Sequence, residues 1–320
     1  MERSDFGKLL AGLVKLTEPQ RKRLRQALDA AAQSPLQAVV AALPPPQECP
    51  HCRADQSQLR PWGQSHGLAR LRCGACQRTF NGLTATPLAH LRKREHWLGY
   101  GQALIEGLSL RQAAARCGVD KDTALRWRHR FLAAAANHRA EREGGIVEAD
   151  ETFFLESFKG QRHLHRPARK RGGTGQAWEH IAVLVVRDRS GQTADFPLER
   201  ADTQHIAAVL RPLVEPDAIL CTDGAAVYKA VSRTLGLSHR AINLQQGIRV
   251  LEGCFHLQNV NAYDSRLKEW LRRFHGVATK YLVNYLGWRR LLERYRQNIT
   301  PVNCLQEALG RFQVQQLTRT

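Results

Sequence analysis

The sequence predicts a multidomain α+β protein in which small N-terminal modules precede a mixed β-sheet flanked by helices. Three features indicate this class: two Cys-x-x-Cys pairs, two short helical patterns separated by a glycine, and a later series of short β-rich runs. We expect an N-terminal helical region with a proline linker over 1–46, a zinc ribbon over 47–84, a helix-turn-helix domain over 85–140, a domain built on the sheet over 144–297 and a C-terminal tail over 298–320.

The N-terminal region has a helical pattern of leucines over residues 5–32, which is interrupted at Pro19. Three consecutive prolines follow at 44–46. Such a run cannot continue a helix and forms a stiff, extended spacer. We therefore place a domain boundary there.

The grouped cysteines predict a structural zinc site. Two knuckles, Cys49-Pro-His-Cys52 and Cys73-Gly-Ala-Cys76, each allow two thiolates to reach one tetrahedral ion. Four sulfurs complete the zinc shell, so we expect neither His51 as a ligand nor any chemistry at this metal. The other four cysteines lie alone in apolar or helical segments, which is typical of a reducing compartment.

A helix-turn-helix pattern follows a helix predicted over residues 87–107. Ser109 caps a first helix, Gly118 allows a turn and Asp120 caps a second helix. We expect Trp127, on the apolar face of the second helix, to belong to the core. An ordinary helical hairpin has the same pattern, so DNA recognition remains a hypothesis.

The outward face of the second helix carries the side chains that would contact DNA. Lys121, Arg126 and Arg130 lie on it and suit phosphates or base edges in a major groove.

The β-rich part begins near residue 144. Strands are predicted over 145–154, 180–187, 192–197 and 218–222, with helices over 202–213 and 225–235. Asp150 closes the apolar start of the first run, and Asp223 closes the fourth, directly before Gly224. If these two strands are neighbours, the two carboxylates meet and can hold a hard cation. Solvated aspartates at strand ends are the alternative.

A polar stripe on a later helix supplies further groups for this site. Asn261, Asp264 and Lys268 are spaced at i, i+3 and i+7, which places them on one face. The helix would then add an oxygen ligand and a cation to the two aspartates. A surface helix with an ion pair between Asp264 and Lys268 explains the same spacing.

The combined pattern resembles the ISXO-type insertion-sequence transposases over about residues 45–295. The motifs that carry this resemblance are the zinc ribbon, the helix-turn-helix, Val147-Glu148-Ala149-Asp150-Glu151-Thr152, Thr222-Asp223-Gly224, and His256-x-x-Asn259-Val260-Asn261 with Lys268. The resemblance implies a bacterial enzyme with a ribonuclease-H-like catalytic domain of the DDE class. Asp150 and Asp223 are then the first two acids, Asn261 takes the place of the third, and Lys268 matches the family's lysine seven residues later. Some branches of the family also carry asparagine there.

The resemblance implies DNA cleavage and strand transfer with two Mg²⁺ or Mn²⁺ ions. Asn261 offers an oxygen but no charge, so we expect weaker metal binding than with three carboxylates. Asp264 is the nearest residue able to compensate, and Glu252 and Glu269 are weaker candidates.

The charge of the chain favours a nucleic-acid partner. Lys and Arg number 48 against 29 Asp and Glu, which gives a net charge of +19 and a pI near 10.2. A field of this sign attracts polyanions. No apolar run approaches the roughly 20 residues of a membrane-spanning helix, and no signal peptide is recognisable. We therefore expect a protein of the cytoplasm and nucleoid, without a membrane partner.

A basic segment over 162–173 is expected to form a flexible loop that touches phosphates through Arg169, Lys170 and Arg171. The partners are then the element's terminal inverted repeats and the target DNA. Because two ends must be joined, we expect a homodimer or a larger assembly.

Two other interpretations remain. In the first, the chain is an inactive, transposase-derived DNA-binding regulator, with Asn261 as the lesion. In the second, it is a nuclease unrelated to transposition that uses the same metal chemistry. Asp150, Asp223 and Lys268 are intact, which favours the transposase.

Overall fold

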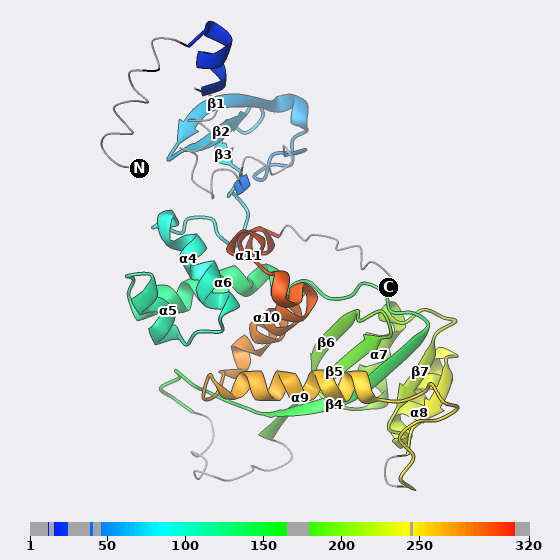
Figure 1. The fold of residues 1–320 in the computed structure, drawn as a ribbon. Helices are drawn as coiled ribbons and strands as arrows, with labels where there is room; N and C mark the ends of the chain where they lie inside the picture. The colour runs from blue at the N-terminus through cyan, green and yellow to red at the C-terminus, as the bar shows by residue number, and fades with distance from the viewer. Residues whose placement is uncertain are drawn as a thin grey trace.

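Two β-sheets and a set of helices make up the computed structural model, which describes residues 12, 16–24, 39–40, 46–164, 179–243 and 246–310. The three-stranded sheet lies at one end of the molecule, and strand β7 and helix α8 of the five-stranded sheet lie at the other (Figure 1). Among the described residues, none of the helices is both long enough and apolar enough to cross a membrane.

The small sheet holds the cysteine knuckles. Its antiparallel strands are β1 (Leu59–Ser65), β2 (Leu68–Cys73) and β3 (Thr79–Asn81), after a short 3-10 turn, η2 (Gln56–Gln58). Its small core contains Cys49, Cys73 and Phe80, which is too little apolar surface to hold the module together without a further restraint.

The next helices follow their predicted caps. After η3 (Arg94–His96) come α4 (Trp97–Ile105), α5 (Leu110–Arg116) and α6 (Lys121–Asn137). Ser109 begins α5 with a capping box, Gly118 turns the chain at φ +57°, and Asp120 caps α6. The helix predicted over 87–107 is wrong for its first half, because His90 and Lys93 take left-handed φ values of 62° and 57°. Trp127 is buried in the core, as expected.

The C-terminal helices pack back onto these helices. They are α10 (Leu282–Tyr295), preceded by η6 (Thr279–Tyr281), and α11 (Pro301–Ala308), preceded by η7 (Arg296–Asn298). Helix α10 crosses α6, and α11 packs against α4 and α6. Where we expect a C-terminal tail, the described part therefore holds α11, whose Cys304 and Leu305 are buried.

The large sheet is mixed and has the order β6-β5-β4-β7-β8. Its strands are β4 (Ile146–Leu155), β5 (His180–Asp188), β6 (Thr193–Leu198), β7 (Ile219–Thr222) and β8 (Ser238–Ala241). Strands β4, β5 and β6 are antiparallel, whereas β7 and β8 run parallel to β4. The four predicted strands are all present, and β8 is additional.

Helices cover both faces of this sheet. Helices α7 (Thr203–Leu213) and α8 (Ala226–Leu235) bury one face, packing on Val147, Ala149 and Leu184 among others. Helix α9 (Gln258–Arg272) lies across the other face, over β4 and β5 (Figure 1). Side chains alternate along a strand, so the even-numbered residues of β4, including Glu148 and Asp150, lie on the α9 side.

Candidate active site and metal centre

Strand pairing brings Asp150 and Asp223 together. In the parallel pair of β4 with β7, Glu148 lies opposite Cys221. Two residues further along the same register, Asp150 is level with Asp223, which directly follows the last residue of β7. The sequence suggests that Asp150 ends its strand, but β4 continues to Leu155 in its hairpin with β5. Asp150 is instead level with the end of the neighbouring strand β7.

The turn after β7 orients Asp223. Its Oδ1 accepts a hydrogen bond from the backbone N–H of Ala225 at 2.9 Å. Gly224 takes a φ of +81°, and a Cβ there would lie 3.1 Å from the Cβ of Ala241 on β8. A glycine is therefore required for this close approach. The carboxylate of Asp223 is left exposed at the sheet edge.

Asp150 lies in an environment that opposes its negative charge. Burial raises the pKa of Asp150, the backbone N–H of Glu151 lowers it, Asp223 raises it, and Lys268 lowers it. The same N–H donates to Asp150 Oδ1 at 2.9 Å. The structure thus places Asp223 and Lys268 each within electrostatic reach of Asp150.

Helix α9 adds a third carboxylate, that of Asp264. Its side chain is 6% exposed, and its buried Oδ1 has no hydrogen-bond partner within the described residues. Burial raises the pKa of Asp264 to about 7, Asp150 adds to the rise, and Lys268 opposes it. Asn261, one turn earlier, is half-buried, while Lys268 is exposed.

A fourth carboxylate belongs to Glu151, which the sequence pattern did not single out as a site residue. Burial raises the pKa of Glu151 to about 7, with Asp150 and Asp223 adding to the rise. As an odd-numbered residue of β4 it points to the α7 and α8 side, so it lies beside the pair of aspartates but on the other face.

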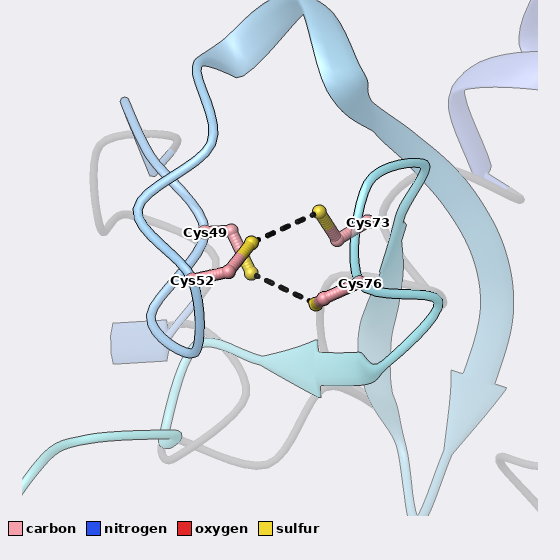
Figure 2. Close-up of side chains that lie close together, drawn as sticks. All are labelled: Cys49, Cys52, Cys73 and Cys76. Atoms are coloured by element: carbon pink, nitrogen blue, oxygen red, sulfur yellow. Dashed lines mark hydrogen bonds between the residues drawn. The ribbon is translucent and has the colours of Figure 1, made fainter.

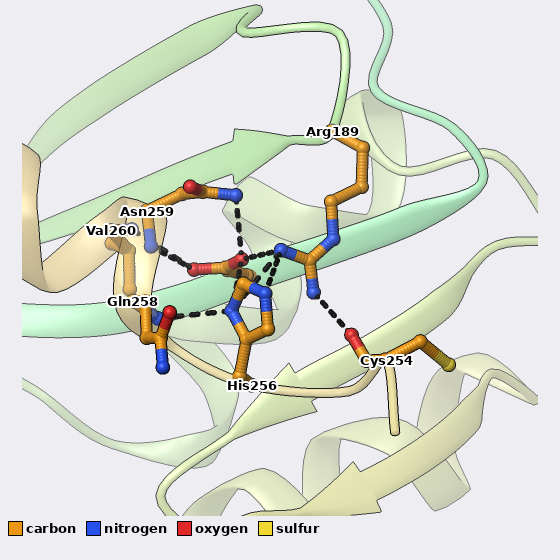
Figure 3. A network of polar contacts seen from close by, with 7 residues as sticks. Arg189, Cys254, His256, Gln258, Asn259 and Val260 are labelled. Atoms are coloured by element: carbon orange, nitrogen blue, oxygen red, sulfur yellow. Dashed lines mark hydrogen bonds and ion pairs between the residues drawn. The ribbon is translucent and has the colours of Figure 1, made fainter. Parts of the chain in front are cut away.

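The buried carboxylate of Glu148 fixes the start of α9. Its Oε2 accepts hydrogen bonds from the backbone N–H groups of Asn259 and Val260 at 2.9 and 3.0 Å, and its Oε1 accepts from Asn259 Nδ2 at 3.0 Å. Arg189 Nη1 lies 2.6 Å and His256 Nδ1 3.3 Å from Oε1. Figure 3 shows the side chains of Arg189, His256 and Asn259 pointing toward the centre of this network.

The contacts of Glu148 join β4 to α9, and Glu148 lies two residues before Asp150 on β4. Arg189 also donates to the carbonyl oxygen of Cys254 at 2.8 Å, so the loop before α9 is held as well. A carboxylate at the N-terminus of a helix satisfies free N–H groups and complements the helix dipole. The position of α9, with Asp264 and Lys268 within electrostatic reach of Asp150, therefore depends on Glu148.

The four grouped cysteines form the other candidate metal site. Their Sγ atoms lie within 4.8 Å of one another, with Cys49 to Cys76 and Cys52 to Cys73 both at 3.7 Å (Figure 2). A tetrahedron with Zn–S bonds of about 2.3 Å has edges of about 3.8 Å, so this set fits zinc. His51 instead packs edge-on against Phe80.

The two cysteine knuckles have the same backbone turn. Arg53 and Gln77, each directly after the second cysteine of its pair, take φ values of 59° and 61°. Their N–H groups donate to the carbonyl oxygens of Cys49 and Cys73, both at 2.9 Å. The matched turns aim both pairs of sulfurs at one point.

The basic residues singled out for DNA contacts have different surroundings. Lys121 and Arg126 are exposed on α6. Arg130 is also exposed, but its guanidinium donates to the carbonyl oxygens of Pro87 and Ala89 and so fixes the preceding loop. Arg169, Lys170 and Arg171 lie outside the described residues.

Comparison with known proteins places part of the chain beside a transposase family. Residues 143–289 match the model of the ISXO2-like transposase domain. It is also 29% identical over 246 residues to an uncharacterised protein in transposable element ISH50 of Halobacterium salinarum, covering 74% of this chain and 82% of that protein. Both findings support the expected resemblance to insertion-sequence transposases.

Solved structures offer only weak likenesses. A simian T-cell lymphotropic virus intasome in complex with PP2A regulatory subunit B56 gamma gives a TM-score of 0.29 at 12% identity, covering 62% of this chain and 69% of that chain. A pre-cleavage Mos1 transpososome gives a TM-score of 0.20 at 14% identity, covering 67% and 79%. Scores this low say nothing about the geometry of the site.

Proposed function

We propose that this protein is the DNA transposase of its insertion sequence, which binds the terminal inverted repeats and catalyses metal-dependent strand cleavage and strand transfer. The observation that carries the proposal is the parallel pairing of β4 with β7, which brings Asp150 level with Asp223 beneath α9. Three antiparallel strands followed by two parallel ones, with helices on both faces, support a ribonuclease-H-like domain of the DDE class.

Asp150 and Asp223 are the residues that would hold divalent cations. Carboxylate oxygens are the ligands that Mg²⁺ and Mn²⁺ prefer, and a cation between these two side chains would offset their mutual repulsion. Asn261 would contribute its amide oxygen, directly or through water. The unpartnered Oδ1 of Asp264 is the further oxygen available on α9. When bound, the cations would activate the attacking oxygen and stabilise the leaving one.

The protein groups around the cations hold the DNA. The exposed ammonium of Lys268, one turn after Asp264, would bind a phosphate next to the scissile bond. The attacking group is water in cleavage and a 3′-hydroxyl in strand transfer, so no Ser, Cys or Tyr nucleophile is required. We therefore expect no covalent link between protein and DNA.

The N-terminal modules would recognise the element's ends. We infer that the cysteine site holds structural zinc in a zinc ribbon, and that α5 and α6 form a helix-turn-helix in which Lys121 and Arg126 face DNA. Arg169, Lys170 and Arg171 would add phosphate contacts without sequence preference. Joining two ends requires at least two copies of the chain, so a dimer or larger assembly forms on DNA.

The test is cleavage of labelled DNA carrying the element's own ends, with Mg²⁺ or Mn²⁺. Asp150→Asn and Asp223→Asn should abolish cleavage and leave DNA binding intact. Asp217→Asn is the matched control, since Asp217 is an exposed aspartate just before β7, and it should cleave like the wild type. Wild-type protein that binds the ends but never cuts them would instead identify an inactive DNA-binding regulator.

A further inference from the structure

The three-stranded sheet lies in a segment that carries positive charge only. Between Asp55 and Glu95 the sequence has no acidic residue. The basic residues of this segment are Arg60, Arg70, Arg72, Arg78, Arg92, Lys93 and Arg94. Three of them, Arg60, Arg70 and Arg72, lie on β1 and β2, so the sheet itself presents unbalanced positive charge.

Strand register places these three arginines on the sheet's outer face. Arg72 pairs with Arg60 on β1 and with Thr79 on β3, so all three share a face. Arg70, two residues before Arg72, is on the same side and donates to the Thr79 hydroxyl. Leu71 and its partner Phe80 point the other way, to the core beneath the cysteines. Leu68, at the start of β2, lies on the arginine side but is buried in the main core, so the basic face is confined to the stretch that carries Arg60, Arg70 and Arg72.

A tryptophan stands on this basic face. Trp62 is 48% exposed, and the guanidinium carbon of Arg72 lies 4.4 Å from its ring centroid. The pairing of β1 with β2 shifts register between Pro61 and Gln64, and Gly63 takes a φ of +68°. Such a bulge increases the local twist and re-aims the side chain beside it.

Exposure of Trp62 leaves unused part of the stabilisation that its burial would give. Fully burying a large apolar side chain is worth about 1.5–3 kcal/mol, and Trp62 is only about half buried. The four other tryptophans that the structure describes, Trp97, Trp127, Trp270 and Trp288, are at most 4% exposed. An aromatic ring held by an arginine, next to further arginines, is the arrangement that stacks on bases while the cations bind phosphates.

We propose that the outer face of β1–β3 is a DNA-binding surface separate from α6, in which Trp62 contacts a base and Arg60, Arg70 and Arg72 contact phosphates. This inference rests on the proposed function, because it names a further site for the same DNA. The positive face excludes a second copy of itself as its partner. Its distance from β7 and α8 places the contact away from the aspartates that would cut (Figure 1).

The experiment measures binding of the full chain to fluorescently labelled DNA of mixed sequence, as a blunt duplex and as the same duplex with a single-stranded extension. Trp62→Ala should weaken binding about tenfold, whereas Trp62→Phe should keep most of it. Arg60→Gln should lower the slope of log affinity against log salt by about 1. A larger loss on the extended DNA would show that Trp62 stacks on unpaired bases, and an equal loss would show contact within the duplex.

Controls separate this site from folding and from the proposed function. Arg233→Gln removes the same charge from an exposed position on α8 and should bind like the wild type. Unfolding temperatures of the Trp62 variants should match the wild type, because the side chain is not in the core. If wild-type protein binds DNA and both Trp62→Ala and Arg60→Gln bind equally well, the surface is not a DNA site although the proposed function stands. If the wild type binds no DNA, the proposed function itself fails.

Discussion

Replacing Glu148 by glutamine should lower the stability of this protein and slow DNA cleavage. The glutamine has nearly the same shape but removes the negative charge that Arg189 and the N-terminus of α9 share. One of its two head-group atoms is an amide nitrogen, which cannot accept a hydrogen bond. Either the backbone N–H groups of Asn259 and Val260 or the guanidinium of Arg189 therefore loses its acceptor.

The contacts of Glu148 set the expected size of the effect. Removing one partner of a buried ion pair costs about 3–5 kcal/mol. The Arg189 side chain is 28% exposed and can regain water, so we expect the lower end, about 3 kcal/mol. Each kcal/mol lowers the unfolding temperature of a domain this size by about 2–4 °C. The unfolding temperature of Glu148→Gln should thus fall by about 10 °C.

Urea unfolding and DNA cleavage measure the two consequences. In Glu148→Gln the free energy of unfolding should fall, and at a temperature where the protein is still folded, cleavage should slow while DNA affinity stays the same. Glu215→Gln, an exposed glutamate after α7, is the matched control. The double variant Glu148→Gln with Arg189→Met should be less destabilised than the sum of the single variants, because no charge is left unpaired. A loss below about 1 kcal/mol in Glu148→Gln would refute the role assigned to this network.

Four further outcomes are expected. Burial, and then Asp188, raises the pKa of Glu143 from its ordinary 4.5 to about 9. The folded state therefore binds the proton more tightly, and the free energy of unfolding falls as pH rises between these values. Glu143→Gln should flatten that fall and raise the free energy of unfolding by about 1–3 kcal/mol at pH 8, measured by urea unfolding. Gly287→Ala places a Cβ 2.5 Å from backbone atoms of Ala135 where α10 crosses α6, and should cost at least about 1–3 kcal/mol in the same assay. Cys52→Ser should lose zinc in metal analysis and unfold the small sheet at lower temperature. Asp264→Asn should raise the Mn²⁺ concentration needed for half-maximal cleavage, with DNA binding unchanged.

The sheet strands were predictable because their signals are local. Four β-rich runs of the second half became β4 to β7 with shifts of only one residue at their ends. Caps at Ser109 and Asp120 likewise fixed the starts of α5 and α6, since a short polar side chain before an apolar pattern has few other uses. The loop over 87–93 was mistaken for helix because its leucines have helical spacing, while the left-handed turns at His90 and Lys93 leave no mark in composition.

Long-range features were harder to predict. Strand β8 has only four residues, Ser-His-Arg-Ala, which do not have the composition of a strand. Its extended conformation depends on its pairing with β7. The sequence places Asp150 at a strand end, whereas only the neighbouring β7 ends there. Glu148 did carry a signal: a glutamate inside a buried strand requires partners. Its partners, Arg189 and the start of α9, are 41 and about 110 residues away in sequence, beyond any local pattern.

The same anchoring bears on the proposed active site, where Asn261 stands at the position expected of a third acid. Glu148 sets the start of α9, along which Asn261 and Asp264 stand one turn apart, with Asp264 near Asp150 of β4. Along the sequence, Asn261 stands at the position of the third acid in the pattern of the resembled family. In space, a carboxylate that moves three residues along a helix stays on the same face, and Asp264 is buried within electrostatic reach of Asp150. We infer that the third negative charge of the proposed site is carried by Asp264, one turn of α9 after Asn261. Asp264 is therefore a better test of the metal site than Asn261.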